Sequence, residues 1–286
     1  MRSFDIELDR HRSLKNTLVS LLLLAMVGFI FFPTFWMVST SVKPNADAFA
    51  MPPQWIPRAV TLENYVSQLV DRAGFVTYVS NGVFVAFTTA LVTILVSVPA
   101  GYAIARLRFW GKRWLLIGIL ASQMFPPVII VIALYSLYRD LSLLDTYFGL
   151  ILSFTSLSLP FSIWMMAGFI ETIPHEIEDA ARVDGCNRSQ VLGQIVLPLI
   201  MPGLVAVGLF SFLNAWNNLI FALSLTTSQA MRTIPPGFLL TYVGEFQYKW
   251  ADMFAGAVIV TLPTVILFIG LQRFLIKGLT AGAVKG

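Results

Sequence analysis

Carboxylates are the side chains of this 286-residue chain that could do acid–base chemistry, and a third of them fall in one short stretch. That stretch holds Glu171, Glu176, Glu178, Asp179 and Asp184 among fifteen acidic residues in all. Acid–base catalysis usually pairs such a group with another carboxylate or with a histidine. The apolar segments on both sides contain no such pair. The sequence therefore predicts that the chain is not an enzyme, and by its residues alone this stretch is either a solvated hairpin between apolar segments or a surface that contacts a partner.

A second group of polar side chains lies in or near otherwise apolar segments. It comprises Asn81, Gln123, Asn214, Trp216, Asn217 and Asn218. Such groups often form interhelical hydrogen bonds in membranes, each contributing about 0.6 kcal/mol. Amides can also line a transport pathway for hydroxyl-rich solutes, because they both donate and accept hydrogen bonds. The pathway interpretation concerns Asn81, Asn214, Trp216, Asn217 and Asn218, and the sequence leaves both interpretations open.

Several other kinds of site are disfavoured by the residues present. Cys186 is the only cysteine, which excludes an intrachain disulfide and a cysteine-rich metal site. His11 and His175 are far apart in the sequence, so we expect no histidine metal site. No G-x-x-x-x-G-K-[ST] sequence occurs, so the chain has no P-loop of its own. The net charge of +4 comes from short basic clusters between apolar segments, so we expect no nucleic-acid partner, and no cofactor or metal.

Composition places the chain in a lipid bilayer. It is 57% hydrophobic and 12% charged, whereas soluble domains are roughly 25% charged. About 20 apolar residues are needed for each membrane span. We predict an all-α membrane protein with a transmembrane domain over 17–276, between an N-terminal segment (1–16) and a C-terminal tail (277–286). Its six spans are predicted at about 17–39, 79–104, 114–138, 147–170, 202–224 and 253–273, with Pro126 and Pro127 breaking the third.

The interiors of these spans hold no charged residue. Charged groups inside a membrane commonly mark proton relays or ion sites, so their absence argues against a proton-coupled carrier. The energy for any transport would then come from another protein. A self-contained secondary carrier or channel for a small polar solute remains the alternative, because backbone carbonyls can hold Na⁺.

Lysine and arginine counts predict the orientation of the spans. Six spans put both termini on one side, with the 171–201 loop. That side holds four basic residues before position 16, four in 106–113, two in the loop and three after position 272. The other side holds only six of the nineteen. The positive-inside rule therefore places both termini and the loop in the cytoplasm.

The 171–201 loop carries the local signals of two short helices around a tight turn. Pro174 suits the first position of a helix, and the acidic residues after it complement the helix dipole. Gly185 can end this helix in the left-handed conformation. Asn187 can then cap a second helix over 189–197, with Gln190 as its capping-box partner and Leu197-Pro198 closing it.

This loop resembles the EAA loop of ABC importer permeases, whose pattern is E-A-A, three residues, G, nine residues, I, one residue, L-P. Asp179-Ala180-Ala181 is followed at those spacings by Gly185, Ile195 and Leu197-Pro198. Asp179 departs from the glutamate usual in the family and shortens the reach of the carboxylate. The segment 214–223 and the tail 277–286 resemble those of maltose-type carbohydrate permeases, in the subunit that lacks a large extra periplasmic domain.

The resemblance implies a type I ABC importer permease in a bacterial inner membrane, transporting a sugar, polyol or related carbohydrate. It implies a second permease subunit, two ATPase subunits that bind ATP and Mg²⁺, and an extracytoplasmic solute-binding protein. The loop would dock in a groove of an ATPase subunit as a coupling helix, and the tail could reach that interface. The docking residues implied are Glu178, Asp179, Ala180, Ala181, Asp184, Gly185 and Arg188.

Overall fold

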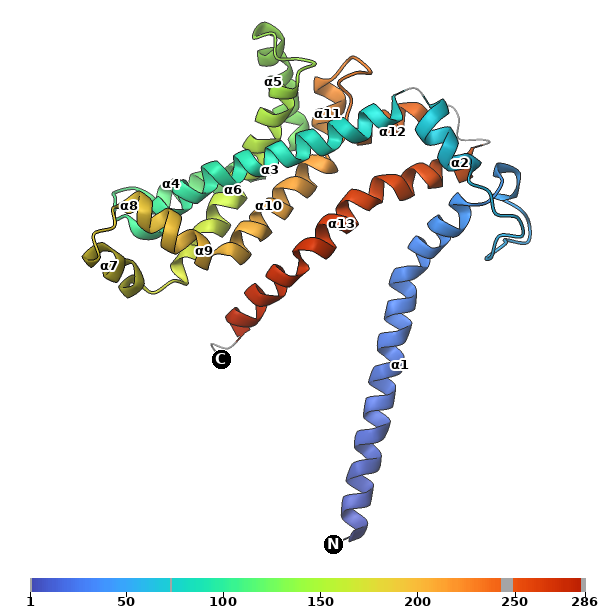
Figure 1. The fold of residues 1–286 in the computed structure, drawn as a ribbon, viewed down its shortest axis with the longest axis horizontal. Coiled ribbons are helices and arrows are strands. Elements are labelled where there is room, and N and C mark those ends of the chain that lie inside the picture. The colour runs from blue at the N-terminus through green and yellow to red at the C-terminus, as the bar shows by residue number, and fades with distance from the viewer. Residues whose placement is uncertain (1, 73, 243–248, 284–286) are drawn as a thin grey trace. The chain divides into compact units, whose positions relative to one another are not determined.

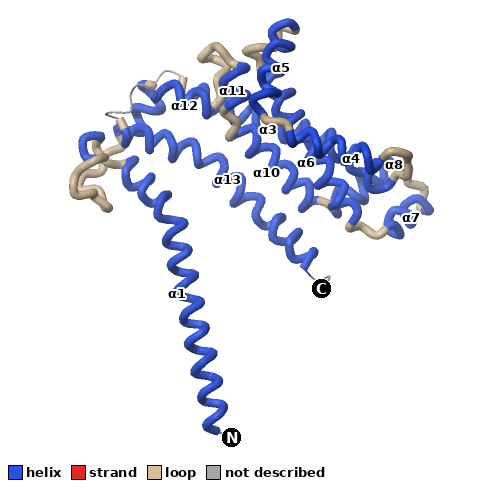
Figure 2. The backbone as a smooth tube through the Cα atoms, turned by 180° about the vertical axis from the view of Figure 1, so that it is seen from behind, coloured by secondary structure: helices blue, strands red, loops and turns tan. Residues whose placement is uncertain are grey.

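The computed structural model describes the backbone of residues 2–72, 74–242 and 249–283, and the side chains of residues 16–72, 74–242 and 249–274. Every regular element within these ranges is a helix (Figures 1 and 2). The all-α class predicted from the sequence is therefore confirmed.

The long helices are α1 (Arg2–Ser41), α3 (Phe75–Arg106), α6 (Tyr147–Glu171), α10 (Met201–Trp216) and α13 (Trp250–Ala283). The shorter elements are η1 (Asn45–Asp47), α2 (Glu63–Val66), η2 (Ser67–Asp71), α4 (Lys112–Ala121), η3 (Ser122–Met124), α5 (Pro127–Asp140), α7 (His175–Val183), α8 (Arg188–Gln190), η4 (Val191–Val196), α9 (Leu197–Leu199), α11 (Ile220–Leu225) and α12 (Ile234–Tyr242).

Four helices are long and apolar enough to cross a membrane. They are α1, α3, α6 and α13, over Asn16–Ser41, Phe75–Arg106, Tyr147–Glu171 and Trp250–Phe274. These stretches cover the first, second, fourth and sixth predicted spans. Two bent pairs of helices meet the same criteria, which gives up to six spans. The last candidate span ends at Phe274, and α13 continues into the predicted tail as far as Ala283; residues 284–286 lie outside the described ranges.

The third predicted span, 114–138, is two helices rather than one. The segment Lys112–Met124 and the helix Pro127–Asp140 meet at 94°. Pro127 takes the first turn of α5, where its missing N–H costs no hydrogen bond. The side chain of Gln123, in the connecting turn, donates from Nε2 to the Leu157 carbonyl of α6 (2.9 Å). The break expected from the two prolines is thus a sharp bend tied to a neighbouring helix.

The fifth predicted span, 202–224, is wrong as one continuous helix. α10 ends at Trp216 and α11 begins at Ile220. Asn218 Oδ1 accepts a hydrogen bond from the Phe221 N–H (3.1 Å), and Asn217 Nδ2 donates to the Leu213 carbonyl (3.1 Å). Asparagine side chains that bond to nearby backbone compete with the helical ladder. The two asparagines therefore interrupt the helix that their apolar neighbours would continue.

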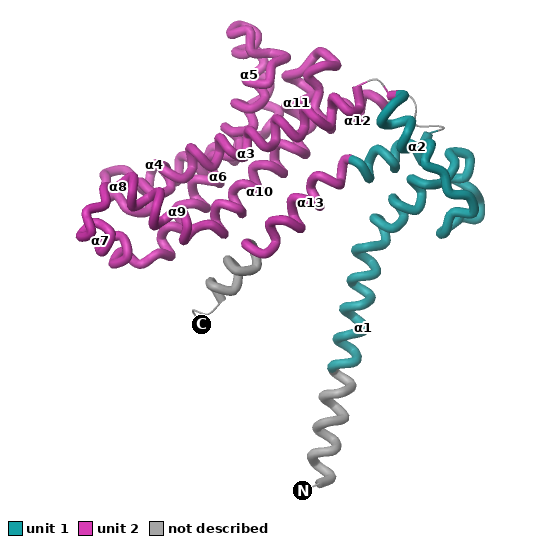
Figure 3. Tube along the Cα trace, viewed as in Figure 1, with its two compact units in different colours: residues 1–71, 244–259 teal, residues 72–243, 260–286 magenta. Residues whose placement is uncertain are grey.

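The chain divides into two compact units (Figure 3). Unit 1 comprises residues 1–71 and 244–259, and unit 2 comprises residues 72–243 and 260–286. In unit 2, α3 packs along α6 and α10. Small and hydroxyl-bearing side chains fill this interface, and the buried ones include Thr89, Thr93, Ser97, Ser153, Ser158, Ser162 and Ser211. Small residues allow membrane helices to approach closely.

Gly101 of α3 lies close against the backbone of α6. A Cβ atom at this position would lie 2.9 Å from Met166 Cβ and 3.0 Å from the Ala167 nitrogen. Only glycine fits at that distance without moving α6. The close contact brings the end of α3, with Tyr102 and Arg106, beside the end of α6 from which the 171–201 loop departs.

Asp145 joins two connecting segments of unit 2 outside the spans. Its Oδ1 accepts hydrogen bonds from the backbone N–H groups of Thr227 (2.9 Å) and Ser228 (3.0 Å). Burial raises the pKa of this carboxyl, but the hydrogen bonds from Ser228 and Thr227 and the charge of Arg232 together hold it below its ordinary value. The ionised carboxylate therefore stabilises the folded connection.

A lowered pKa makes this stabilisation depend on pH. It is fully present above the unfolded pKa of about 3.9 and is lost as the pH falls through the lower folded pKa. We expect Asp145→Ala to destabilise the connection by about 1–3 kcal/mol, since two backbone donors lose their acceptor. Asp145→Asn keeps an oxygen acceptor and should cost less, while removing the acid dependence. Amide hydrogen exchange at residues 225–230 measures both effects. A wild-type exchange profile in Asp145→Ala at neutral pH would contradict the expectation.

Candidate functional site

The segment after α6 forms two short helical parts joined by a tight turn. α7 ends at Val183, and Gly185 follows with φ +89°. The Gly185 N–H donates to the Arg182 carbonyl (3.1 Å), and the Cys186 N–H donates to the Ala181 carbonyl (3.0 Å). These two bonds are those of a Schellman motif, which needs a left-handed residue at the position of Gly185. The glycine turn predicted from the sequence is confirmed.

The second part begins with the predicted capping box. Asn187 Oδ1 accepts from the Gln190 N–H (2.9 Å), and Gln190 Oε1 accepts from the Asn187 N–H (2.8 Å). The winding then continues through α8, η4 and α9 to Leu199, beyond the predicted end at Pro198. Pro198 lies in the first turn of α9, where it needs no N–H partner. Pro174 likewise differs from expectation, because it caps α7 rather than starting it.

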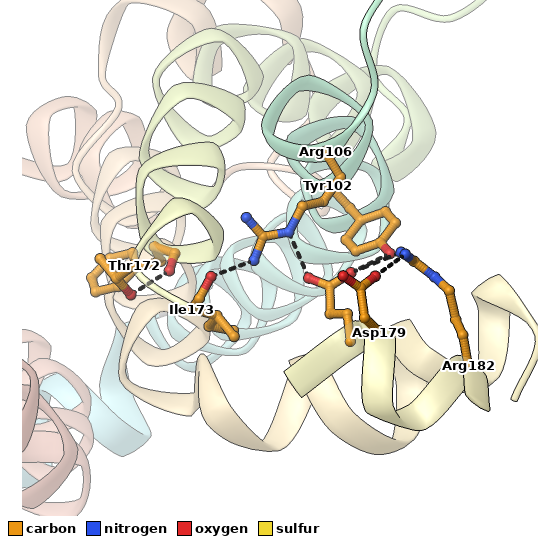
Figure 4. A network of polar contacts seen from close by, with 8 residues as sticks. Tyr102, Arg106, Thr172, Ile173, Asp179 and Arg182 are labelled. Atoms are coloured by element: carbon orange, nitrogen blue, oxygen red, sulfur yellow. Dashed lines mark hydrogen bonds and ion pairs between the residues drawn. The ribbon is translucent and has the colours of Figure 1, made fainter. Parts of the chain in front are cut away.

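Glu178 joins α7 to the end of α3, and its side chain is buried. Arg106, the last residue of α3, donates from Nε to Glu178 Oε1 (2.5 Å) and from Nη2 to the Ile173 carbonyl (2.8 Å), as Figure 4 shows. Tyr102 donates its hydroxyl to Glu178 Oε2 (2.8 Å). Only 4% of the Arg106 side chain and 1% of the Glu178 side chain are exposed. Charge-assisted bonds in a dry site fix α7 against α3 and against the end of α6.

Glu178, one of the expected docking residues, is therefore not on the outer face of the loop. Its carboxylate is covered by this chain and turned toward α3, where it holds the loop. Arg182 reaches the same carboxylate from the outer side at 3.4 Å, and it pairs with Asp179 at 2.7 Å. These outer contacts are partly exposed, so they contribute less than about 1 kcal/mol each. The strength of the junction lies in the Arg106–Glu178 pair.

The remaining expected docking residues lie on the outer side of the loop, with one exception. Asp179, Ala180, Asp184, Gly185 and Arg188 are exposed. Ala181 is buried on the same side of α7 as Glu178. Val183 is 87% exposed beside them, an unusual position for an apolar side chain. The outer face therefore combines acidic, small and apolar groups on a short helix, which suits insertion into a groove of another protein.

A layer of buried apolar side chains packs the loop against the end of α6. Val191, Val196 and Ile200 are buried against Ile170 and Ile173 from the end of α6. Each fully buried aliphatic side chain of this size contributes about 1.5–3 kcal/mol relative to an exposed one. The loop is thus a packed extension of the bundle, able to carry force between its outer face and α3 or α6.

The polar residues near the spans separate into two environments. Asn214, Asn217 and Asn218 line a cavity of about 510 Å³ together with Gln123, which the pathway interpretation did not include. Its other lining residues are Pro127, Leu157, Leu219, Ile220 and Phe221. Gln123 lies in the turn after α4, Asn214 lies in the last turn of α10, and Asn217 and Asn218 follow that helix. No charged side chain lines this cavity.

Asn81 and Trp216 lie elsewhere and belong to the packing. Asn81 Nδ2 donates to the carbonyls of Ala230 (2.7 Å) and Arg232 (2.9 Å), while its Oδ1 accepts from the Tyr147 hydroxyl (2.7 Å). Trp216 is buried and stacks on Phe212, with ring centroids 5.4 Å apart. Asn81 thus makes an interhelical hydrogen bond with Tyr147 of α6, and Asn214 makes another, from its Nδ2 to Ser158 Oγ of α6 (3.2 Å), whereas Trp216 stacks within its own helix. Within the described ranges, no three His, Cys, Asp or Glu side chains gather closely enough to hold a metal ion.

Tyr102 and Arg106 are the residues of this site that the sequence did not single out. Arg106 is visible only as part of a basic cluster with Arg108, Lys112 and Arg113. Nothing in the local sequence distinguishes the one arginine that turns inward from those that face solvent. Arg106 is buried whereas Arg108 is exposed, and this difference arises from the packing of α3 on α6.

Comparison with known proteins gives the same account over nearly the whole chain. Residues 97–281 match the family described as "Binding-protein-dependent transport system inner membrane component". The diacetylchitobiose uptake system permease protein DasC of Streptomyces coelicolor is 36% identical, covering 91% of this chain and 93% of its own length. The sulfoquinovosyl glycerol transport system permease protein SmoH of Agrobacterium fabrum is 39% identical, covering 89% of both chains.

A solved structure supports the fold. A chain from a bacterial ABC transporter involved in the import of the acidic polysaccharide alginate superimposes with a TM-score of 0.76 at 25% identity. The match covers 90% of this chain and 95% of that chain. With its apolar helices and its EAA-type loop, the chain belongs to the family of inner membrane components of binding-protein-dependent transport systems and is a permease subunit of an ABC importer.

Proposed function

We propose that this subunit imports a carbohydrate and that its 171–201 loop couples transport to ATP hydrolysis by a separate ATPase. The observation that carries the coupling is the placement of α7. Its outer face is exposed, while its inner face is fixed to α3 by Arg106 and Glu178. A helix held in this way transmits a push on its outer face to the bundle.

The ATPase contacts proposed are Asp179, Ala180, Asp184, Gly185 and Arg188, with Ala181 supporting them from the inner side. ATP and Mg²⁺ would be bound by the partner, which also supplies the catalytic groups. Pairing with a second, different permease subunit and delivery of solute by an extracytoplasmic binding protein complete the proposed assembly. The cytoplasm is the proposed compartment for both termini and for the loop. A reporter active only outside the membrane, fused at residue 187, should be inactive; activity there would reverse the orientation.

The carbohydrate class rests on two observations. DasC is named for diacetylchitobiose uptake and SmoH for sulfoquinovosyl glycerol transport. The amide-lined cavity offers donors and acceptors without a charge, and hydroxyl groups need both. We infer that Gln123, Asn214, Asn217 and Asn218 contact the solute on its way through the subunit. Asn81 and Trp216 have no part in this proposal because their side chains serve the packing.

Asn217 provides the test of that pathway. Its Nδ2 bonds only to the carbonyl of Leu213 in its own helix, so its replacement should not disturb neighbouring helices. We expect Asn217→Leu to lower uptake roughly two- to tenfold through loss of one hydrogen bond to the solute. Asn217→Gln retains an amide and should lie closer to wild type. Uptake in membrane vesicles and co-purification of the ATPase measure the two effects. Unchanged uptake in Asn217→Leu would favour a packing role.

Reconstitution tests the function as a whole. In liposomes, the chain alone should transport nothing, whereas the complex isolated with its ATPase should take up solute only with ATP inside the compartment equivalent to the cytoplasm. Uptake or conductance by the chain alone would instead identify a self-contained carrier or channel. Co-purification of an ATPase from native membranes separates the two outcomes before any solute is known.

A further inference from the structure

Unit 1 has its polar side chains inside and its apolar side chains outside. Its buried groups beyond α1 include Lys43, Asn64 and Gln68. Asn64 Nδ2 donates to the carbonyls of Ser41 and Lys43, both at 2.8 Å, and Lys43 Nζ donates to the Gln54 carbonyl at 2.6 Å. This is the reverse of a domain that folds in water, where apolar groups fill the interior.

The outer surface of the same segment is apolar and largely uncovered. Its exposed apolar side chains are Phe49, Met51, Trp55, Ile56, Val60, Leu62, Val66, Leu69 and Val70. Leu62 immediately precedes α2, and the residues at positions 66, 69 and 70 follow it at helical spacing along α2 and η2. The polar positions 64 and 68 lie on the inner face of the same helical stretch. The short helix is therefore amphipathic, with its apolar face turned away from its own unit.

The loop before α2 lies beside a membrane span. Trp55 packs against Phe32 and Trp36 of α1, with ring centroids 5.6 and 5.5 Å apart. Ser39 Oγ donates to the Trp55 carbonyl (2.8 Å), and this bond holds the loop beside the end of α1. Phe32 and Trp36 precede the end of α1 at Ser41 by nine and five residues, or about 14 and 7 Å of helix at 1.5 Å per residue. The chain thus leaves α1 and folds back along the apolar helix that it has just completed.

From this arrangement we propose that residues 49–70 form an interfacial collar, a surface that lies in the headgroup and acyl boundary of the outer leaflet. The apolar surface continues directly from α1, whose side chains from Asn16 to Phe35 are exposed and mostly apolar. Tryptophan beside the end of a span suits the membrane interface. Amphipathic helices lie in that layer with their apolar face about 5–10 Å deep. The occupant of this surface is therefore lipid, and the internal bonds of Lys43 and Asn64 keep their polar atoms away from it.

Spin labels at single cysteines test the collar in the assembled protein. Cys186, the only native cysteine, is replaced by serine, and labels are placed at Ile56 and Val70 on the apolar surface. Glu63 serves as the matched control because it is exposed on the same short helix, and Leu24 within α1 is the reference for the bilayer interior. Collision with oxygen, which concentrates in hydrocarbon, is compared with collision with a water-soluble nickel chelate. The samples are native-membrane nanodiscs that retain the subunits bound to this chain.

We expect the oxygen-to-nickel collision ratio to be several-fold higher at Ile56 and Val70 than at Glu63, and to approach that at Leu24. Equal ratios at Ile56, Val70 and Glu63 would show that the collar faces water, which overturns the proposal. Low collision with both reagents at Ile56 and Val70 would show that protein covers the surface, which also overturns it. A label at Val66 repeats the measurement if either of the first two variants fails to accumulate.

Discussion

Replacing Arg106 by alanine is expected to loosen the 171–201 loop and to uncouple ATP hydrolysis from transport. The substitution leaves the Glu178 carboxylate buried, with the Tyr102 hydroxyl and the partly exposed Arg182, at 3.4 Å, as its partners. Removing one partner of a buried ion pair costs about 3–5 kcal/mol, because the other charge stays desolvated. The Ile173 carbonyl loses its donor in the same step. Both bonds that Arg106 makes to this part of the loop are therefore lost together, while the Tyr102 hydroxyl still ties Glu178 to α3.

Hydrogen exchange measures this loosening directly. If α7 opens locally, its amides should exchange about 10² to 4 × 10³ times faster in Arg106→Ala, the factor that corresponds to about 3–5 kcal/mol at 1.4 kcal/mol per decade. Arg106→Lys keeps the charge but cannot reach both Glu178 and Ile173 with a rigid fork. Its amide exchange rates should therefore lie between those of the wild type and of Arg106→Ala. ATPase activity of the purified complex should no longer respond to solute and binding protein in Arg106→Ala.

Arg108→Ala is the matched control, since Arg108 is exposed two residues further along the same segment. It removes the same charge from the same region without touching Glu178. Its exchange profile and its coupling should stay at the wild-type level. Identical behaviour of Arg106→Ala and Arg108→Ala would show that the buried pair does not hold the loop.

Gly185→Pro is expected to abolish solute-stimulated ATPase activity while the protein remains in the membrane. Proline requires φ near −65°, whereas Gly185 has φ +89°. The substitution also removes the N–H that bonds to Arg182. The turn between α7 and α8 cannot close, so the outer face of α7 loses its position relative to Asn187 and the second helical part.

Less drastic substitutions at Gly185 test how far backbone strain alone reduces coupling, because they leave the outer face of the loop in place. A Cβ atom here would meet nothing within 4 Å, so Gly185→Ala should cost only the left-handed strain of about 1–2 kcal/mol. Gly185→Asn should cost less, because asparagine tolerates this conformation. Coupling should therefore fall in the order Gly, Asn, Ala, Pro. Stimulated ATPase activity per unit of membrane protein gives the ranking.

Gly111→Pro controls for proline itself. Gly111 has φ +86° and open surroundings, but it lies outside the loop at the start of α4. Coupling in this variant should exceed that in Gly185→Pro by a wide margin. Normal coupling in Gly185→Pro would remove the reason for assigning the coupling role to this turn.

The local signals of the loop were readable from the sequence because each acts over a few residues. Gly185 ends a helix through its own backbone conformation, and the N–H groups of Gly185 and Cys186 bond to carbonyls three and five positions before them. Asn187 and Gln190 cap each other across three residues. Four of the spans were likewise predictable, since apolar length alone decides what a bilayer accepts. Such features need no knowledge of the remaining chain.

The tertiary structure alone decided which partners those elements meet. Glu178 and Arg106 are 72 positions apart, and only the close packing at Gly101 brings them together. The same packing makes Arg106 an anchor and leaves Arg108 in solvent. The asparagines near the spans share one residue type, yet Asn81 binds two backbone carbonyls, Asn214 lines a cavity and also bonds to Ser158, and Asn217 lines the same cavity while bonding only within its own turn. The sequence alone predicted most of the helices, the glycine turn and the location in a membrane, because propensity and hydrophobicity are properties of short segments. The roles of Glu178, Arg106 and each asparagine depend on contacts between distant segments, and those follow only from how the helices pack.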